Sequence, residues 1–350
     1  MKVARKRMTL GSSRTFGCLL ILVTVLLFSL VVACGAKGSE VVVYVSLDQP
    51  FSEPILKAFE RETGIKVKAV YDVEAAKTTG LVNRLIAESS RPNADVFWNN
   101  ECAQTILLQE RGLLEPYDSP SAGDIPQQFR DPEASWAGFA ARARVIIVNT
   151  DLVEEEDYPR SIFDLLDPAW RGEIGIANPL FGTAATHAAA LFAFLGEADA
   201  EAYFQGLLTN EVRVVDGNSV VRDMVVSGEL KVGLTDTDDA FVAIERGDTV
   251  TMIFPDQDGI GTFSIPNTVM LIAGAPNPHE ARLLIDYLLS REVEEALAHA
   301  SSRQMPVRSG VSTPGDMPSL GDLRSMDVHP QEVTDWMDAS SAWLRESFLR

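Results

Sequence analysis

The sequence predicts an α/β protein of two lobes, with a ligand-binding cleft between them. Short apolar or β-branched runs alternate with stretches of helical periodicity along most of the chain, which is typical of α/β domains. Of the 350 residues, 317 follow the N-terminal apolar segment described next, and that length is sufficient for two lobes. The middle of the chain repeats the alternation as a second unit inserted into the first. In such folds, ligands bind in the crevice at the carboxyl ends of the strands.

The N-terminal segment has the layout of a secretory signal peptide. Five basic residues precede the apolar run Phe16–Ala33, and Cys34 follows directly after a small residue. This arrangement resembles a lipoprotein signal, in which the cysteine is lipidated and becomes the first residue of the mature protein. An uncleaved membrane anchor is the alternative, because about 18 apolar residues just span a bilayer. We expect a signal peptide at 1–33 and a short tether at 34–40, with the rest of the chain exported and held at the membrane.

The composition of the mature part excludes some function classes. It carries 25 Lys and Arg against 50 Asp and Glu, a balance that disfavours nucleic acid and attracts cations. Cys102 is its only thiol besides Cys34, so we expect no internal disulfide and no zinc site built from thiolates. We expect Cys102 to be a small buried apolar side chain.

The first unit of the fold alternates three strands with three helices. Strands are expected where β-branched or alternating apolar residues run together, at 41–45, 65–71 and 94–98. Helices are expected where apolar residues recur at helical spacing, and glycine ends two of them; the ranges are 53–63, 79–88 and 103–111.

The second unit and the return to the first follow the same rules. The expected strands are 144–148, 173–177, 212–215, 231–234, 249–254 and 268–272, and we expect the sheet to be mainly parallel. The expected helices are 187–195, 201–209, 220–227, 279–290 and 292–300, followed by short helices in the last forty residues.

The order of seven segments between Val41 and Pro306 resembles the extracellular solute-binding proteins of bacterial ABC importers, and most of all their ferric-ion-binding group. The segments are VVVYVSLDQPFSEPILKAFERETGIKVKAVY, TGLVNRLIAE, NADVFWNNECAQTILLQERGLL, ARARVIIVNT, SIFDLLDPAWRGEIGIANP, VVSGELKVGLTDTDDA and IPNTVMLIAGAPNPHEARLLIDYLLS.

This resemblance implies a periplasmic-binding-protein fold of type II, which closes on a ligand and docks to a membrane permease. It implies a monomer that has no tightly bound cofactor and no catalytic activity. Lobe 1 is expected to comprise 41–139 and about 263–300, and lobe 2 to comprise 140–262 and about 301–350.

The same resemblance suggests a metal ligand set. Iron-binding relatives carry a histidine after the first strand, where this chain has Asp48, and a glutamate after the third, where it has Glu101. Their pair of tyrosines is replaced here by Asp238 and Asp239. The implied cargo is ferric iron with a carbonate-type anion, although the missing tyrosines leave other metals open.

The chemistry of these four carboxylates favours a hard cation. An all-oxygen anionic site suits Fe(III), Ca²⁺, Mg²⁺ or Mn²⁺. A polyamine is an alternative, because Trp98 could offer an aromatic face to an organic cation. Each residue also has an ordinary structural role open to it: Asp238 and Asp239 as caps of a helix near Ala240, Asp48 as a loop carboxylate and Glu101 as a solvated first-turn residue.

A second group of residues is suited to an anion. Arg142 lies in the crossover segment, where relatives use an arginine to bind the carbonate-type anion. Asn178 and Thr183 precede or open an expected helix, and Asn218 opens another, so backbone N–H groups converge there. Ser46, at the end of the first strand, completes the predicted ligand-binding residues. A phosphate- or phosphonate-type solute remains an alternative, and so does a structural role in which Arg142 pairs with a carboxylate and Thr183 caps its helix.

Enzyme activity is the rival function class. The sequence has no G-x-S-x-G, H-E-x-x-H or P-loop motif. Two carboxylates in a cleft could perform acid–base chemistry, but carboxylates are abundant in this chain. The sequence therefore favours a binding protein over a secreted enzyme.

Overall fold

The computed structural model describes residues 39–71, 79–315, 317–318 and 320–349. The predicted signal peptide and the predicted lipidation site at Cys34 lie outside the described residues. Within the described ranges, none of the helices has both the length and the apolar character that crossing a membrane requires.

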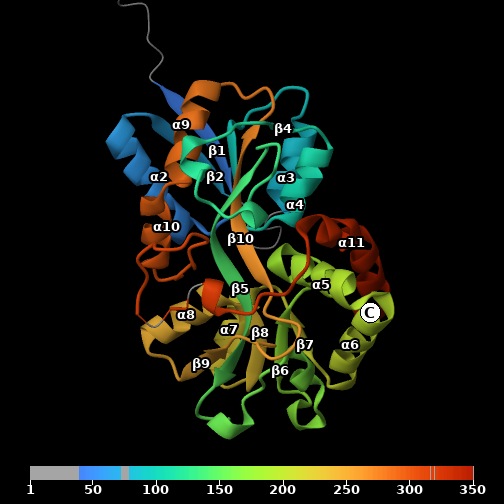
Figure 1. The fold of residues 1–350 in the computed structure, drawn as a ribbon. Helices are drawn as coiled ribbons and strands as arrows, with labels where there is room; N and C mark the ends of the chain where they lie inside the picture. Colours follow the sequence, from blue (N-terminus) through green and yellow to red (C-terminus); the bar gives the residue numbers. More distant parts are fainter. Residues whose placement is uncertain (1–38, 72–78, 316, 319, 350) are drawn as a thin grey trace, which may run out of the picture. The chain divides into compact units, whose positions relative to one another are not determined.

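Ten strands form one continuous sheet (Figure 1). They are β1 (Glu40–Val45), β2 (Lys66–Tyr71), β3 (Val96–Asn99), β4 (Leu114–Glu115), β5 (Ala137–Asn149), β6 (Ile174–Ala177), β7 (Arg213–Val215), β8 (Val232–Asp236), β9 (Val250–Ile253) and β10 (Ser264–Ile272). The order is β2-β1-β3-β10-β5-β8-β6-β7, with β4 beside β10 and β9 beside β5. We call β1–β4 the first strand group and β6–β9 the second.

The two long strands β5 and β10 connect these groups and make the sheet mixed. β1 pairs in parallel with β2 and β3, and β6 pairs in parallel with β7 and β8. β5 is antiparallel to β10 along its first half and to β8 and β9 along its second half. The expectation of a mainly parallel sheet is therefore wrong in the middle, because one strand runs straight from the first group into the second.

Helices cover both faces of the sheet. They are α2 (Gln49–Thr63), α3 (Thr79–Ala87), α4 (Ala103–Glu110), α5 (Gly182–Leu195), α6 (Glu197–Thr209), α7 (Asn218–Val226), α8 (Thr237–Arg246), α9 (Pro278–Leu288), α10 (Arg291–Ala298) and α11 (Pro330–Trp343). Short 3₁₀ turns, among them Ile162–Leu166 and Pro168–Trp170, fill the connections.

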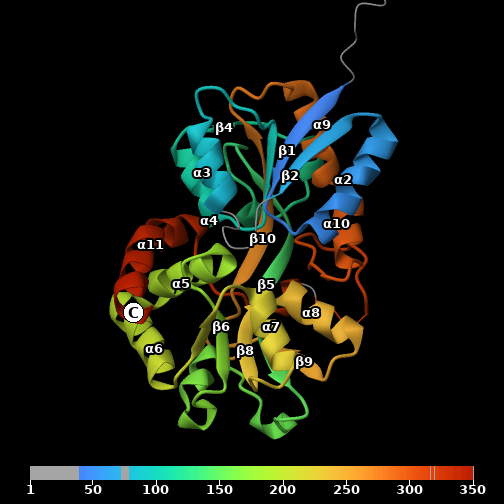
Figure 2. The ribbon, with the colours of Figure 1, turned by 180° about the vertical axis from the view of Figure 1, so that it is seen from behind.

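The first strand group is buried on both faces, which explains its uninterrupted apolar runs. Val41, Val43 and Val45 pack in one apolar cluster with residues of α2, α9 and α10. Tyr44, which points to the opposite face, packs in another cluster with residues of α3 and α4. Figures 1 and 2 show these two sets of helices on opposite sides of β1.

The second strand group is covered in the same way. Residues of α5, α6 and α11 form one apolar cluster, and residues of α7 and α8 form another. The C-terminal region holds the 14-residue helix α11, longer than the short helices expected there. Trp336 and Trp343 of α11 pack against Phe192 of α5 at ring distances of 5.7 and 5.9 Å. The Thr334 hydroxyl donates to the Ala103 carbonyl at 3.2 Å, so α11 contacts both α5 and α4.

In the described part of the chain, five helices begin two or more residues earlier than the sequence suggests. α5 begins at Gly182 rather than His187, α6 at Glu197 rather than Glu201, and α7 at Asn218 rather than Val220, so Thr183 and Asn218 lie in first turns. α2 begins at Gln49 rather than at Glu53, because Pro50 is tolerated in the first turn. α8 begins at Thr237 rather than near Ala240, which moves two predicted ligands into its first turn. The boundaries of the two lobes stay a prediction.

Candidate functional site

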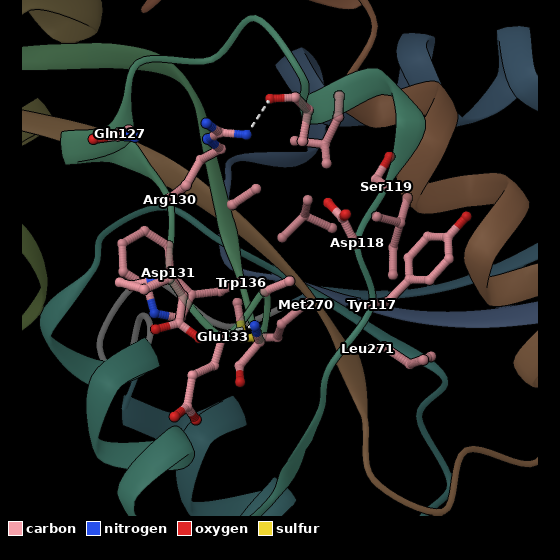
Figure 3. Close-up of a pocket in the computed structure, with 18 residues that line it drawn as sticks. Tyr117, Asp118, Ser119, Gln127, Arg130, Asp131, Glu133, Trp136, Met270 and Leu271 are labelled. Atoms are coloured by element: carbon pink, nitrogen blue, oxygen red, sulfur yellow. Dashed lines mark hydrogen bonds between the residues drawn. The ribbon is translucent and has the colours of Figure 1, made fainter.

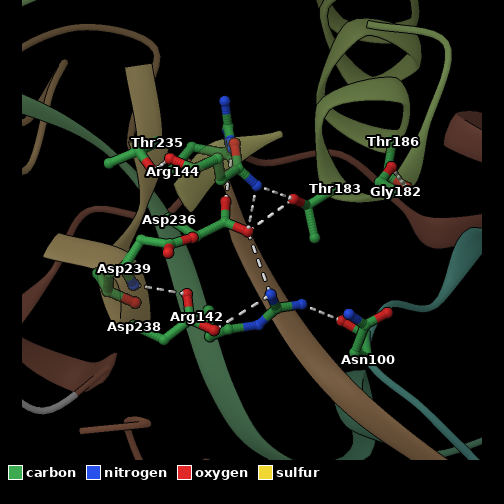
Figure 4. Close-up of polar contacts among 12 residues, drawn as sticks. Asn100, Arg142, Arg144, Gly182, Thr183, Thr186, Thr235, Asp236, Asp238 and Asp239 are labelled. Atoms are coloured by element: carbon green, nitrogen blue, oxygen red, sulfur yellow. Dashed lines mark hydrogen bonds and ion pairs between the residues drawn. The ribbon is translucent and has the colours of Figure 1, made fainter. Parts of the chain in front are cut away.

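Polar side chains from four elements meet where β8 ends (Figure 4). β5 supplies Arg142 and Arg144, and β8 ends at Asp236. Thr183 lies in the first turn of α5, and Asn218 is the first residue of α7. The sheet order places β8 between β5 and β6, so residues distant in sequence converge on the same edge.

Asp236 is the centre of this cluster. Its Oδ1 accepts a hydrogen bond from Arg144 Nη1 at 2.6 Å. Its Oδ2 accepts from Thr183 Oγ1 at 2.6 Å, from Asn218 Nδ2 at 3.0 Å and from Arg142 Nη1 at 3.1 Å. Burial alone would raise the pKa of Asp236, but the two arginines and the hydrogen bonds hold it below its usual value. Asp236 is therefore an ionised carboxylate, 1% exposed.

Arg142 links this cluster to the first strand group. Its Nη1 lies 3.5 Å from Asp238 Oδ2, and its Nη2 donates to the Asn100 carbonyl after β3. Burial alone would lower the pKa of Arg142, yet the negative charges of Asp238, Asp236, Asp48 and Asp239 raise it. Three predicted metal ligands therefore lie close enough to one guanidinium for their charges to act on it.

Asp238 and Asp239 lie in the first turn of α8. Asp238 Oδ1 accepts from the Asp239 N–H at 3.1 Å, and Asp239 Oδ1 accepts from Arg222 Nη1 at 3.0 Å. The N-cap position belongs to Asp236, so the expectation that this pair caps a helix near Ala240 is wrong. The side chain of Asp236 makes no capping bond to its own helix.

Glu101 is completely buried, which excludes the solvated first-turn role considered for it. Its carboxylate accepts from the N–H groups of Ala103 and Gln104 at 2.7 and 3.0 Å, at the start of α4. It also accepts from Thr186 Oγ1 of α5 at 3.1 Å. Burial raises the pKa of Glu101, and these hydrogen bonds oppose that shift.

The remaining predicted ligand-binding residues are Asp48, Ser46, Trp98 and Asn178, and they do not share the hydrogen bonds of the Asp236 cluster that are described above. Asp48, half-buried, follows β1 and makes no side-chain cap of α2. The Ser46 hydroxyl is buried and has no hydrogen-bond partner among the described residues. Trp98 is fully buried against Phe139, so protein covers the aromatic face considered for a polyamine. Asn178 accepts from the Leu180 N–H at 3.0 Å in its own loop.

Two further residues are packed rather than reactive. Cys102 is buried, and burial followed by the charge of Glu101 raises the pKa of its thiol. His187 is buried in α5 and stacks on Phe263 at 5.5 Å. Burial, helped by the charge of Arg144, lowers the pKa of His187 to about 3, so the ring is neutral at pH 7.

Metal ligands are not gathered in this structure. In the described ranges, no group of three or more His, Cys, Asp or Glu side chains is arranged to hold a metal ion. Asp48, Glu101, Asp238 and Asp239 remain predicted ligands.

Asp236 was not selected from the sequence as a ligand, although Arg142 and Arg144, which lie in the crossover segment, were considered for an anion. Asp236 belongs to the same Thr-Asp-Thr-Asp-Asp stretch as the predicted pair. The available signal was an acidic residue shortly after a buried apolar run, in a chain that also carries two closely spaced arginines at 142 and 144.

A cavity whose lining includes no residue of this cluster is shown in Figure 3. It measures about 520 Å³ and is lined in part by β10 and the start of β5. Its wall includes Trp136 and Met270, with Asp118, Asp131 and Glu133 among its polar residues. None of the predicted ligand-binding residues lines it.

Comparison with known proteins identifies relatives along most of the chain. A family model described as bacterial extracellular solute-binding protein matches residues 94–327. Iron uptake protein A1 of Synechocystis sp. is 29% identical over 301 residues, covering 83% of this chain and 81% of that protein. The Fe(3+)-binding periplasmic protein of Serratia marcescens is 24% identical over 319 residues, covering 89% of this chain and 93% of that protein.

Solved structures show the same fold. Iron-bound HitA from Pseudomonas aeruginosa superposes with a TM-score of 0.78 at 22% identity, covering 87% of this chain and 98% of HitA. The predicted α/β fold of the two-lobed periplasmic binding proteins is confirmed by this likeness.

Proposed function

This chain belongs to the family of bacterial extracellular solute-binding proteins, and we propose that it is the cargo-binding component of an ABC importer. Its cargo is ferric iron or another hard cation, which it delivers to a membrane permease. The iron named for two relatives supports this cargo. Members of this family bind solutes, and this chain accordingly acts without catalysis and as a monomer.

One electrostatic observation supports a cation. The charges of Asp48, Asp236, Asp238 and Asp239 all act on Arg142. Arg144 pairs with Asp236, and Arg222 pairs with Asp239. A cluster of carboxylates raises the local concentration of cations. Carboxylate oxygen is also the ligand type that hard cations prefer.

The predicted ligand set contains no tyrosine, so we expect a colourless complex. Burial raises the pKa of Tyr44 and Tyr71 to about 12, and burial raises that of Tyr203 further. Phenolate forms less readily at these residues than in free tyrosine. A carboxylate site lacks the visible phenolate-to-iron charge-transfer band, so a coloured ferric complex would contradict the ligand set and point to a tyrosine.

The direct test combines metal analysis with titration. Protein purified from its native compartment should contain iron by inductively coupled plasma analysis, and the apo protein should bind Fe(III) stoichiometrically. The double variant Asp238→Asn, Asp239→Asn should stay folded and lose this binding. Glu154→Gln with Glu155→Gln, two adjacent exposed carboxylates, is the matched control. Stabilisation by spermidine but not by Fe(III) would replace iron with an organic cation.

The proposal has two further parts, a lipid anchor at Cys34 and closure of the two lobes on the cargo. Lipidation of Cys34 holds the exported protein at the membrane, and Cys34→Ala should release it or leave it unprocessed. Unchanged attachment with normal signal removal would exclude the lipid. Closure of the two lobes on cargo should reduce the radius of gyration in small-angle scattering.

A further inference from the structure

The carboxylate of Asp236 lies where two helices begin. Thr183 donates to it from the first turn of α5, and Asn218 donates to it from the first residue of α7. Phe181 and Gly217, the N-cap residues of these helices, make no side-chain capping bonds. Helix N-termini favour negative charge, so this position suits an anion.

From its position in the chain, Asp236 would ordinarily cap a different helix, α8. Aspartate at an N-cap position usually accepts from the N–H groups of the helix that follows it. Asp236 is the N-cap residue of α8, yet its side chain makes no such bond. Its carboxylate bonds instead to Arg142, Arg144, Thr183 and Asn218.

The groups that hold Asp236 include three that the sequence assigned to an external anion, namely Arg142, Thr183 and Asn218. A side-chain carboxylate presents the same planar pair of oxygens as bicarbonate or a carboxylic acid. The local charge is also already balanced, because Asp236 and Asp238 lie within ion-pair distance of Arg142 and Arg144. A further anion would add unbalanced negative charge where all four residues are at most 5% exposed.

We propose that Asp236 is a built-in anion, which occupies the anion position permanently and lets the protein bind its cation without a carbonate-type partner. The inference rests on the proposed function for the identity of the cargo. The occupancy of the anion position by Asp236 can be tested on the apo protein alone.

The first experiment removes the carboxylate and supplies it from solution. Asp236→Ala leaves the two arginines without their shared partner, so acetate, bicarbonate or phosphate should bind and raise its melting temperature. At a hundredfold excess over Kd, the rise should be roughly 4 °C beyond that in chloride of equal ionic strength. Asp256→Ala is the control, since Asp256 is a buried carboxylate that accepts from Ser161 and Ile162 and contacts neither arginine. It should show no such rescue.

The second experiment uses the unaltered chain and does not depend on a variant that folds. Titration of the apo protein with bicarbonate, phosphate or citrate should shift its melting temperature no more than chloride does. Stabilisation by any of these anions that disappears in Arg142→Ala would overturn the proposal, and so would a folded Asp236→Ala without anion rescue.

The third experiment connects the inference to cargo. In Fe(III) exchange at fixed chelator, adding 10 mM bicarbonate should change the affinity less than about twofold, because the anion position is filled. A tenfold gain would overturn the built-in anion while leaving iron binding intact. Absence of iron binding in every buffer, together with anion rescue of Asp236→Ala, would reject the proposed cargo and retain the role of Asp236.

Discussion

The cluster around Asp236 and the cluster around Arg308 both bury arginine against carboxylate, but they differ in how completely their donors are used. Arg308 donates to Asp124, to Glu294 and to the carbonyls of Ser121 and Leu289. In the Asp236 cluster, the Nε atoms of Arg142 and Arg144 are buried and have no hydrogen-bond partner among the described residues.

The difference separates a structural ion pair from a candidate binding site. Glu294 also accepts from the N–H groups of Ala140 and Val307 at 2.8 and 2.9 Å, so it fixes the start of β5 to the chain after α10. A fully satisfied network rigidifies its surroundings. Buried donors without partners call for a functional explanation, and those of the Asp236 cluster lie at the carboxyl end of β8.

The largest stability effect is expected at the Arg308 cluster. Glu294→Gln removes the charge that Arg308 and two backbone N–H groups share, and should lower the free energy of unfolding by about 3–5 kcal/mol. Asp236→Asn should lower it less, although Arg144 loses its carboxylate partner, because Asp238 still balances Arg142 and the network around Asp236 already leaves buried donors unsatisfied. Urea unfolding at pH 7 measures both, with the exposed neighbour Glu295→Gln as control. A greater loss of unfolding free energy in Asp236→Asn than in Glu294→Gln would contradict this prediction.

His187 should give the Asp236 side of the molecule a distinct acid sensitivity. Its folded pKa of about 3 lies below the unfolded value of about 6.5, so the unfolded state binds more protons between these values. Stability should therefore fall as the pH drops through this window, by about 2 kcal/mol between pH 6 and pH 4.

His187→Gln should remove that part of the pH dependence, since glutamine does not titrate. Urea unfolding at pH 4, 5 and 6 measures the slope in both proteins. Carboxylates also titrate near pH 4, so the difference between the unaltered chain and His187→Gln isolates the contribution of the histidine. An unchanged slope in His187→Gln would show that another group causes the acid loss.

Thr183→Val tests a single donor to Asp236. The variant keeps the shape of the side chain and loses the 2.6 Å hydrogen bond to the carboxylate. The expected loss of unfolding free energy is about 1.5 kcal/mol, the lower range for a bond to a charged group. Thr209→Val, which removes an exposed hydroxyl bonded only to the Gln205 carbonyl, should lose less. Equal losses of unfolding free energy in the two variants would mean that a hydrogen bond to the buried Asp236 carboxylate stabilises the fold no more than an exposed one.

The smallest effect is expected at the edge of the Asp236 cluster. Asp239 and Arg222 are 20% and 11% exposed in their ion pair. Asp239→Asn should lower the free energy of unfolding by less than about 1 kcal/mol in urea, because solvent screens partly exposed pairs. A loss of several kcal/mol of unfolding free energy would show that this ion pair contributes as much as a fully buried one.

The sequence predicted most elements of the fold because their patterns are local. The run Val41–Val45 and the periodicity of 279–290 match β1 and α9 closely. The long strand β5 was recognised only in its apolar half, since Ala137–Ala143 consists mainly of small residues and gives no β-branched signal. Its antiparallel direction follows from pairing with β10, which lies more than a hundred residues away in sequence.

The candidate site was predicted less completely because it depends on which strands become neighbours. The structure brings three of the predicted residues, Arg142, Thr183 and Asn218, together around Asp236. Asp236 was overlooked because a shift of one position along the Thr-Asp-Thr-Asp-Asp stretch changes which side chain points at the arginines. Trp98 was expected to face a ligand, but its indole N–H donates to Asn267 within the core.

The buried thiol of Cys102 makes this protein convenient for distance measurements. It is the only cysteine in the part of the chain that the structure describes, and its side chain is 7% exposed with a raised pKa. Maleimide reagents attack exposed thiolates, so a mature chain that lacks Cys34 should remain almost unlabelled at pH 7. Cysteines introduced on α3 and α8 would then carry spin labels without background, and their separation would report closure in solution.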